Sequence, residues 1–139
     1  MYFLPVMLTG AFLAEAAATV DNKLNVSGGV LSRFVVGPDR WVRLVLVVLT
    51  RAGAGADDGG AEDRGVDIEI KPPTLDDPMR QRFEVPEASI GEFPGYAFFD
   101  IQATLPFDGR WAIEVTGGGQ TISLPLVVDS WAPPPPAGI

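Results

Sequence analysis

The sequence contains no cysteine and no histidine. Without cysteine there can be no disulfide, no thiolate metal site and no thiol nucleophile. Without histidine the chain lacks an imidazole metal ligand, a Ser-His-Asp triad and the usual general base near neutral pH. Because these absences remove most known catalytic and transition-metal chemistry, we predict a protein that is not an enzyme and that has no metal site and no cofactor.

Basic residues are also scarce, with 10 Lys and Arg against 18 Asp and Glu, and the formal net charge is −8 at pH 7. Nucleic acids select basic surfaces, so this balance predicts no nucleic-acid partner. The apolar residues 2–14 are too few to span a bilayer, and no positive charge precedes Lys23, as a secretory signal would require. We therefore predict no membrane span and a cytoplasmic location. At the N-terminus, a first strand or strand pair is favoured over a cleaved signal peptide.

Long segments with a helical period are missing, and short segments with a period of two replace them. The 16 glycines and 13 prolines among 139 residues suit many short strands joined by turns. Apolar and polar residues alternate as in half-buried strands. The sequence predicts an all-β fold, an antiparallel β-sandwich of about eight strands in a single domain over residues 1–131. The expected strands are 8–20, 24–36, 41–50, 66–70, 81–85, 97–105, 111–115 and 122–128. Alanine propensity makes 11–18 the best helix candidate, but we favour a strand there.

Turn residues lie between these strands. Asp21-Asn22 and Asp108-Gly109 are typical of tight turns, and Gly37-Pro38-Asp39 separates two further strands. The glycines at 117–119 predict a hairpin. Pro125 lies inside a strand pattern, which predicts an edge strand or a bulge.

Two segments have too few apolar residues to pack. Residues 52–65 are rich in Gly, Ala and acidic residues, and we predict a mobile acidic loop. Its carboxylates, Asp57, Asp58, Glu62 and Asp63, could bind calcium, but a solvated loop is favoured because the spacing fits no EF-hand. Residues 132–139 form a Pro-rich tail. Its four consecutive prolines could be a ligand for an aromatic groove, although a linker or disordered tail is favoured.

Other polar and glycine motifs have a catalytic and a structural interpretation. Asp100 and Glu114 could face the same side of adjacent strands, as the two carboxylates of a glycosidase would. Ordinary outward-facing carboxylates are favoured. Asp76-Asp77-Pro78 is interpreted as a turn. Gly28-Gly29 and residues 117–119 lack the following helix and lysine of a phosphate-binding loop, so we interpret them as bulges or turns.

The expected strand at 41–50 is apolar on both faces. One face has Trp41, Arg43, Val45, Val47 and Leu49, and the other has Val42, Leu44, Leu46 and Val48. A strand in a two-layer sandwich should bury one face only. Either another part of the chain covers the first face, with residues 3–13 as a candidate, or that face is an interface with a partner.

Residues 13–29, which read Leu-Ala-Glu-Ala-Ala-Ala-Thr-Val-Asp-Asn-Lys-Leu-Asn-Val-Ser-Gly-Gly, resemble the opening of a bacterial domain family of unknown function. Its members have an apolar strand followed by a Lys-Leu-x-Val-x-Gly-Gly motif. The order of later elements is similar too, with a Gly-Arg-Trp turn at 109–111 and a Leu-Pro-Leu-Val-Val strand. Glu15 and Asn22 depart from the Asp and Gly that the family favours. The resemblance implies a β-sandwich and no assigned activity.

Two functions follow as hypotheses. The first is a non-enzymatic β-sandwich that acts by protein association, either as a homo-oligomer or with a protein partner. The alternative is a small-ligand or carbohydrate-binding module in which Trp41, Tyr96, Phe98 or Trp131 stack on the ligand. Association predicts a flat apolar patch, whereas a binding module predicts a concave pocket with converging polar groups.

Overall fold

Ten β-strands and one short 3₁₀ turn make up the described residues, 6–53 and 64–131, of the computed structural model. The elements are β1 (Val6–Ala14), β2 (Ala16–Val20), β3 (Lys23–Ser27), β4 (Arg33–Val36), β5 (Trp41–Ala52), β6 (Gly65–Lys71), β7 (Met79–Glu84), η1 (Glu87–Ser89), β8 (Gly95–Thr104), β9 (Gly109–Gly117) and β10 (Gln120–Ser130). The described residues contain no α-helix, and the all-β prediction is confirmed. The strand candidate at 11–18 is extended, as favoured.

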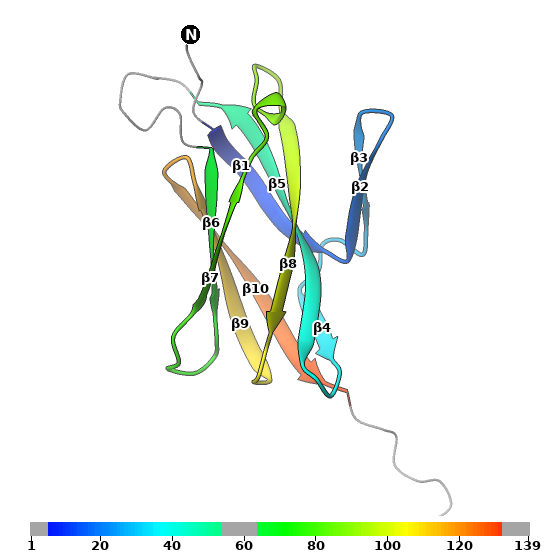
Figure 1. The fold of residues 1–139 in the computed structure, drawn as a ribbon, viewed down its shortest axis with the longest axis vertical. Helices are drawn as coiled ribbons and strands as arrows, with labels where there is room; N and C mark the ends of the chain where they lie inside the picture. Colours follow the sequence, from blue (N-terminus) through cyan, green and yellow to red (C-terminus); the bar gives the residue numbers. More distant parts are fainter. Residues whose placement is uncertain (1–5, 54–63, 132–139) are drawn as a thin grey trace, which may run out of the picture.

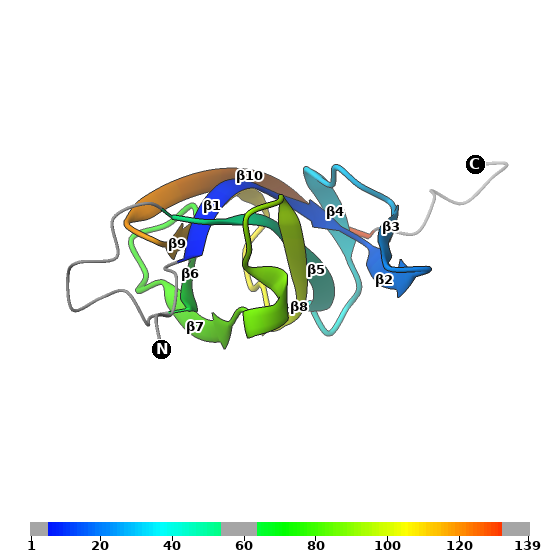
Figure 2. The ribbon, with the colours of Figure 1, turned by 90° about the horizontal axis from the view of Figure 1, so that it is seen from above.

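The strands form three sheets, ordered β1-β5-β8, β4-β10-β9-β6-β7 and β2-β3 (Figure 1). Seen from above, the first two sheets curl around a common interior, with β1 next to β10 and β7 next to β8 (Figure 2). All pairs are antiparallel except β4 and β10, which run parallel. The expectation of a wholly antiparallel arrangement is therefore wrong at that pair.

Two expected strands are each divided, which raises the number from about eight to ten. The segment 8–20 bends at Glu15 into β1 and β2, and 24–36 breaks after Ser27 into β3 and β4. Gly28 has a φ of +66°, a conformation that residues with a Cβ rarely adopt. The side chain of Glu15 also lies where a Cβ at Gly28 would be. The chain therefore leaves the strand direction here, and β2 and β3 form a separate hairpin.

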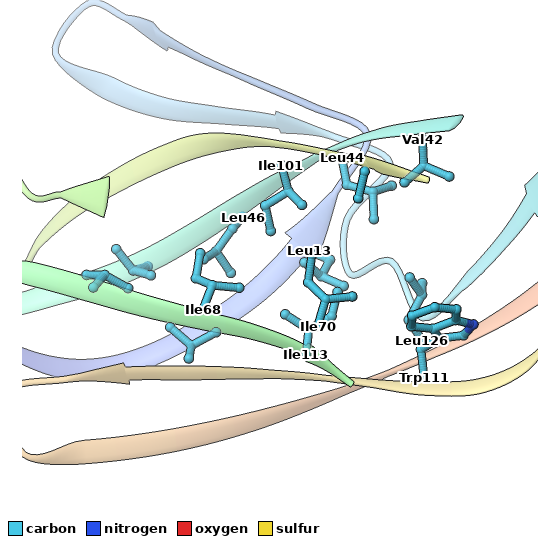
Figure 3. Close-up of a cluster of buried hydrophobic side chains, with 14 of the residues drawn as sticks. Leu13, Val42, Leu44, Leu46, Ile68, Ile70, Ile101, Trp111, Ile113 and Leu126 are labelled. Carbon is cyan, nitrogen blue, oxygen red and sulfur yellow. The ribbon is translucent and has the colours of Figure 1, made fainter. Parts of the chain in front are cut away.

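The interior is filled by the alternate side chains that the period of two predicts. Figure 3 shows them meeting between the sheets. The labelled side chains, all buried, are Leu13, Val42, Leu44, Leu46, Ile68, Ile70, Ile101, Trp111, Ile113 and Leu126. Burying a side chain of this kind stabilises a fold by about 1.5–3 kcal/mol. The indole Nε1 of Trp111 donates a hydrogen bond to the carbonyl oxygen of Phe107 at 2.9 Å, so its polar atom is satisfied.

Two of the predicted tight turns are present, but Asp108-Gly109 is not one, because Gly109 already belongs to β9. Asp21 and Asn22 have φ of 51° and 60° and join β2 to β3, while Gly118 and Gly119 join β9 to β10. Positive φ at both central residues suits the twist of a two-residue hairpin. Pro125 lies in β10 where no strand pairs on the β4 side, because β4 pairs only with residues 127–130. The strand is thus locally an edge, as the proline predicted.

Arg40 connects the ends of the two larger sheets. Its guanidinium donates hydrogen bonds to the Leu105 carbonyl oxygen at 2.6 Å, the Ser130 hydroxyl at 2.8 Å and the Asp108 carboxylate at 2.7 Å. The Ser130 hydroxyl and Arg40 together lower the pKa of Asp108. Leu105 follows β8 and Ser130 ends β10, so this network links the two sheets at one end of the interior.

Part of the sequence prediction lies outside the described residues. Of the expected acidic loop at 52–65, the structure describes only residues at its two ends, with Ala52 in β5 and Gly65 in β6. The carboxylates Asp57, Asp58, Glu62 and Asp63 lie outside, as does the Pro-rich tail 132–139.

Candidate functional site

The outer face of the three-stranded sheet carries a row of apolar side chains. In the register of β1, β5 and β8, Phe12, Val47 and Phe98 lie side by side. The next row contains Gly10, Leu49 and Tyr96. We call this surface the apolar strip and define it as Phe12, Val45, Val47, Leu49, Tyr96 and Phe98. Its residues come from three separate parts of the chain, and the pairing of the strands brings them together.

The β2–β3 hairpin lies against this strip as a third layer. Its residues Thr19 and Leu24 face one way, because they are cross-strand partners. The hydroxyl of Thr19 lies 2.8 Å from that of Tyr96, which fixes this side of the hairpin toward the sheet. Beneath the hairpin, Val45 is 6% exposed and Val47 is fully buried. The hairpin therefore covers the centre of the apolar strip.

The predicted cover, residues 3–13, does not lie over this face. Its described part belongs to β1, which pairs edge to edge with β5 in the same sheet. A strand beside β5 cannot cover its outer face, because neighbouring strands of a sheet lie in one layer. The bend at Glu15 instead sends the next segment of the chain across the face.

The five candidate interface residues therefore differ in accessibility. Val45 and Val47 are buried within the chain. Trp41 is 49% exposed at the start of β5, and Leu49 is 36% exposed near its end. The guanidinium of Arg43 lies 2.7 Å from the Asp100 carboxylate, in an exposed ion pair. A partner could contact Trp41, Arg43 and Leu49 without any rearrangement, but not the two valines.

The four aromatic residues considered for ligand stacking do not form one platform. Tyr96 and Phe98 have ring centroids 6.4 Å apart and planes within 6° of each other. Trp41 pairs with Thr104, at the opposite end of β5 from the partner of Tyr96. Trp131 follows β10, in the other sheet. Only Tyr96 and Phe98 are neighbours.

The alternative of a catalytic carboxylate pair does not hold, and both carboxylates lie on outer faces, as favoured. Asp100 lies on β8 and Glu114 on β9, and these strands belong to different sheets. Each carboxylate binds a cation on its own outer face, Arg43 at 2.7 Å and Lys71 at 2.6 Å respectively. Because β8 and β9 are consecutive in the chain, the sequence suggested adjacent strands, but the turn between them crosses from one sheet to the other.

The outer face of the five-stranded sheet is polar. One row across β10, β9, β6 and β7 contains Ser123, Glu114, Glu69 and Arg80. Glu69 binds Arg80 at 3.0 Å, and the Nζ of Lys71 lies 2.6 Å from Glu114. The hydrogen bond to Glu114 raises the pKa of Lys71. These charges neutralise one another along the sheet surface.

No metal centre is evident in the part of the chain that the structure describes. No group of three or more acidic side chains there could hold a metal ion. An open hollow of about 520 Å³ lies over β6 and β7, lined by paired charges that include Asp67 and Arg82. Asp76 accepts a hydrogen bond from the Thr74 hydroxyl in the bend between β6 and β7, as expected for a turn. No helix among these residues is long and apolar enough to cross a membrane.

Comparison of the chain with protein-family models, with curated proteins and with solved structures finds no match. The sequence identified β5 as the strand with two apolar faces, but it missed Phe12 and the β2–β3 hairpin as parts of the same surface. The two-residue turn Asp21-Asn22, between five-residue segments, was the signal for that hairpin.

Proposed function

We propose that this chain is a non-enzymatic β-sandwich domain that acts by association with another protein. The contact surface would be the exposed part of the apolar strip. One observation carries the proposal: Leu49, 36% exposed, adjoins the partly exposed Tyr96 and Phe98, so this part of the strip is a contiguous apolar surface. The absence of histidine and cysteine supports a role without catalysis or a cofactor.

The size of this surface suits a partner that contributes further contacts. Burying Leu49 and the exposed parts of Tyr96 and Phe98 would add at most about 1.5–3 kcal/mol for each side chain. The loss of translational and rotational freedom on association opposes this by several kcal/mol. The strip alone would therefore not hold a stable dimer. The resemblance to a bacterial family of unknown function stays a prediction and implies no assigned activity.

Site-specific photo-crosslinking in the native cell tests the proposal. A photoreactive amino acid at position 96 should give a discrete adduct with a second protein, and the substitution Leu49→Glu should abolish that adduct. Leu75 is fully exposed in the bend between β6 and β7, so Leu75→Glu is a matched control that should leave the adduct unchanged. No adduct from position 96, or equal yields from both variants, would refute association through this surface.

A further inference from the structure

The edge of β8 that faces away from β5 has no strand partner among the described strands. β8 is an edge strand of the three-stranded sheet, and β7 is an edge strand of the five-stranded sheet. The two strands lie next to each other on one side of the common interior (Figure 2). Side chains fill the space between them. The rings of Phe83 and Phe99 stack with centroids 4.9 Å apart, and Gln81 Nε2 donates to the Gln102 carbonyl oxygen at 3.0 Å.

The Gln81 contact shows which backbone groups of β8 point to this edge. The N–H and C=O of one residue in a strand point to the same side, and those of the next residue point to the other side. Because the Gln102 carbonyl points to β7, the backbone groups of Phe98 and Asp100 do so too. On the opposite side, the Leu105 N–H donates to the Arg40 carbonyl oxygen at 2.9 Å, as this alternation requires. Across the described residues, neither Phe98 nor Asp100 has a backbone partner at the free edge.

Two other sheet edges, those of β7 and β4, are protected in ways that this one is not. Natural proteins prevent unwanted strand pairing with charged side chains, proline or very short edge strands. β7 carries Arg80, Arg82 and Glu84, and β4 has only four residues, one of them Arg33. β8 has ten residues with one charge, Asp100, and no proline. The start of β8 is covered by η1, because the Thr50 hydroxyl beside it donates a hydrogen bond to the Ser89 carbonyl oxygen. The stretch of this edge with no paired strand is therefore residues 98–104.

An added strand at this edge would replace the contact that Gln81 makes with Gln102. Paired strands lie about 4.8 Å apart, and their backbones bond directly. Here a glutamine side chain spans the distance from β7 to the backbone of β8. The two backbones are therefore farther apart than a paired couple, and Gln81 occupies the position that the backbone of an intervening strand would take.

We propose that residues 98–104 of β8 accept an extended segment of a partner protein, which adds to the three-stranded sheet antiparallel to β8. This inference rests on the proposed function, because the added strand would extend the apolar strip. Only an extended backbone offers donors and acceptors that alternate as those of the β8 edge do. The side chain opposite Phe98 would be apolar and continue the row of Phe12 and Val47. Side chains on the inner face would be uncharged and would pack on Phe83 and Phe99.

Selection from a random dodecapeptide display library tests this proposal. Peptides selected on the wild-type protein should lose at least about tenfold in affinity for Asp100→Pro, because proline removes the N–H that the added strand needs. Proline is tolerated at an edge position whose N–H faces outward, so the variant should fold. Asp100→Asn is the matched control, since it also loses the Arg43 ion pair but keeps the N–H. Peptides should bind it as they bind the wild type.

A second variant tests the edge without proline. Gln81→Ala frees the Gln102 carbonyl, so the selected peptides should bind roughly 2–10-fold more tightly. A library that yields no binder, or peptides that bind Asp100→Pro and wild type equally while Gln81→Ala changes nothing, would overturn the proposal. Leu49→Glu separates this inference from the proposed function. Cellular association that is lost in Leu49→Glu but unchanged in Asp100→Pro would support the apolar strip and refute the edge.

Discussion

The outer faces of the two larger sheets differ in the kind of side chain they carry and in how those side chains are accommodated. On the five-stranded sheet, outward side chains are charged and pair across strands, as Asp67 does with Arg82 and Glu69 with Arg80. On the three-stranded sheet, the outward side chains at the centre are apolar, and a second element of the chain covers them. Val47 and Glu69 both occupy strands inside their sheets, yet Val47 is fully buried and Glu69 is exposed enough to form surface ion pairs.

The difference shows where the molecule can accept a partner. A face that neutralises its own charges gains little from a protein partner, because the ion pairs are already made and surface pairs contribute only about 0–1 kcal/mol each. A covered apolar face loses its hydration once, on folding, and any part left uncovered still gains from contact. The hairpin leaves Leu49 and the β8 edge uncovered, so both proposals concern this side of the molecule.

The largest difference is expected when a charge is placed on the outer face of each sheet. Val47→Glu puts a carboxylate under the hairpin, where no cation faces it, and should destabilise the fold by about 3–5 kcal/mol. Ala112→Glu places the same group on the five-stranded sheet, opposite Lys71, and should change stability by less than about 0.5 kcal/mol. Urea unfolding followed by tryptophan fluorescence measures both.

Equal effects of these two substitutions would show that the faces do not differ as described. A folded Val47→Glu protein whose β2–β3 amides exchange rapidly with solvent would show that the hairpin lifts off and the rest of the fold survives. In that case the loss in global stability should fall below about 2 kcal/mol, because the carboxylate regains its hydration.

The sequence predicted the inner faces far better than the outer ones. The alternation of Val66, Ile68 and Ile70 predicted a strand and its buried side, and these three side chains are buried. Alternation within one strand depends only on nearest neighbours and on burial, so it is visible locally. The same reasoning found both apolar faces of β5.

What covers an outer face depends on the direction of the chain after a turn, which no periodicity records. The bend at Glu15 and the positive φ of Gly28 decide that β2 and β3 leave the sheet of β1. Likewise, nothing in the turn before Gly109 shows that β9 belongs to a different sheet from β8. Predicting these positions requires the packing of the whole domain, which is why the sequence alone left open whether Asp100 and Glu114 lie on adjacent strands.

A smaller effect on stability is expected from removing one charge on the outer face of the five-stranded sheet. Glu69 binds Arg80 and Lys71 but lies directly opposite Glu114, so Glu69→Gln removes two attractions and one repulsion. Stability at low salt should fall by less than about 1 kcal/mol, and the difference should shrink further in 1 M salt. Urea unfolding at the two salt concentrations measures it. A loss that persists in high salt would mean that packing of the Glu69 side chain, and not its charge, stabilises this face.

The smallest expected effect concerns pH. The hydrogen bond from Lys71 to Glu114 raises the pKa of Lys71 above its ordinary value. A group whose pKa is higher in the folded state stabilises the fold below its unfolded pKa, which is near 10.4 for lysine, and this contribution disappears as the pH rises through the folded value. The urea midpoint of the wild type should therefore fall between about pH 10 and 12 by more than that of Lys71→Gln, which cannot titrate there. The only other lysine, Lys23, is exposed on the hairpin and is present in both proteins, so its contribution cancels in the difference. Parallel declines in the two proteins would show that the Lys71–Glu114 pair does not contribute to the stability of this face, which would then depend on its arginine pairs.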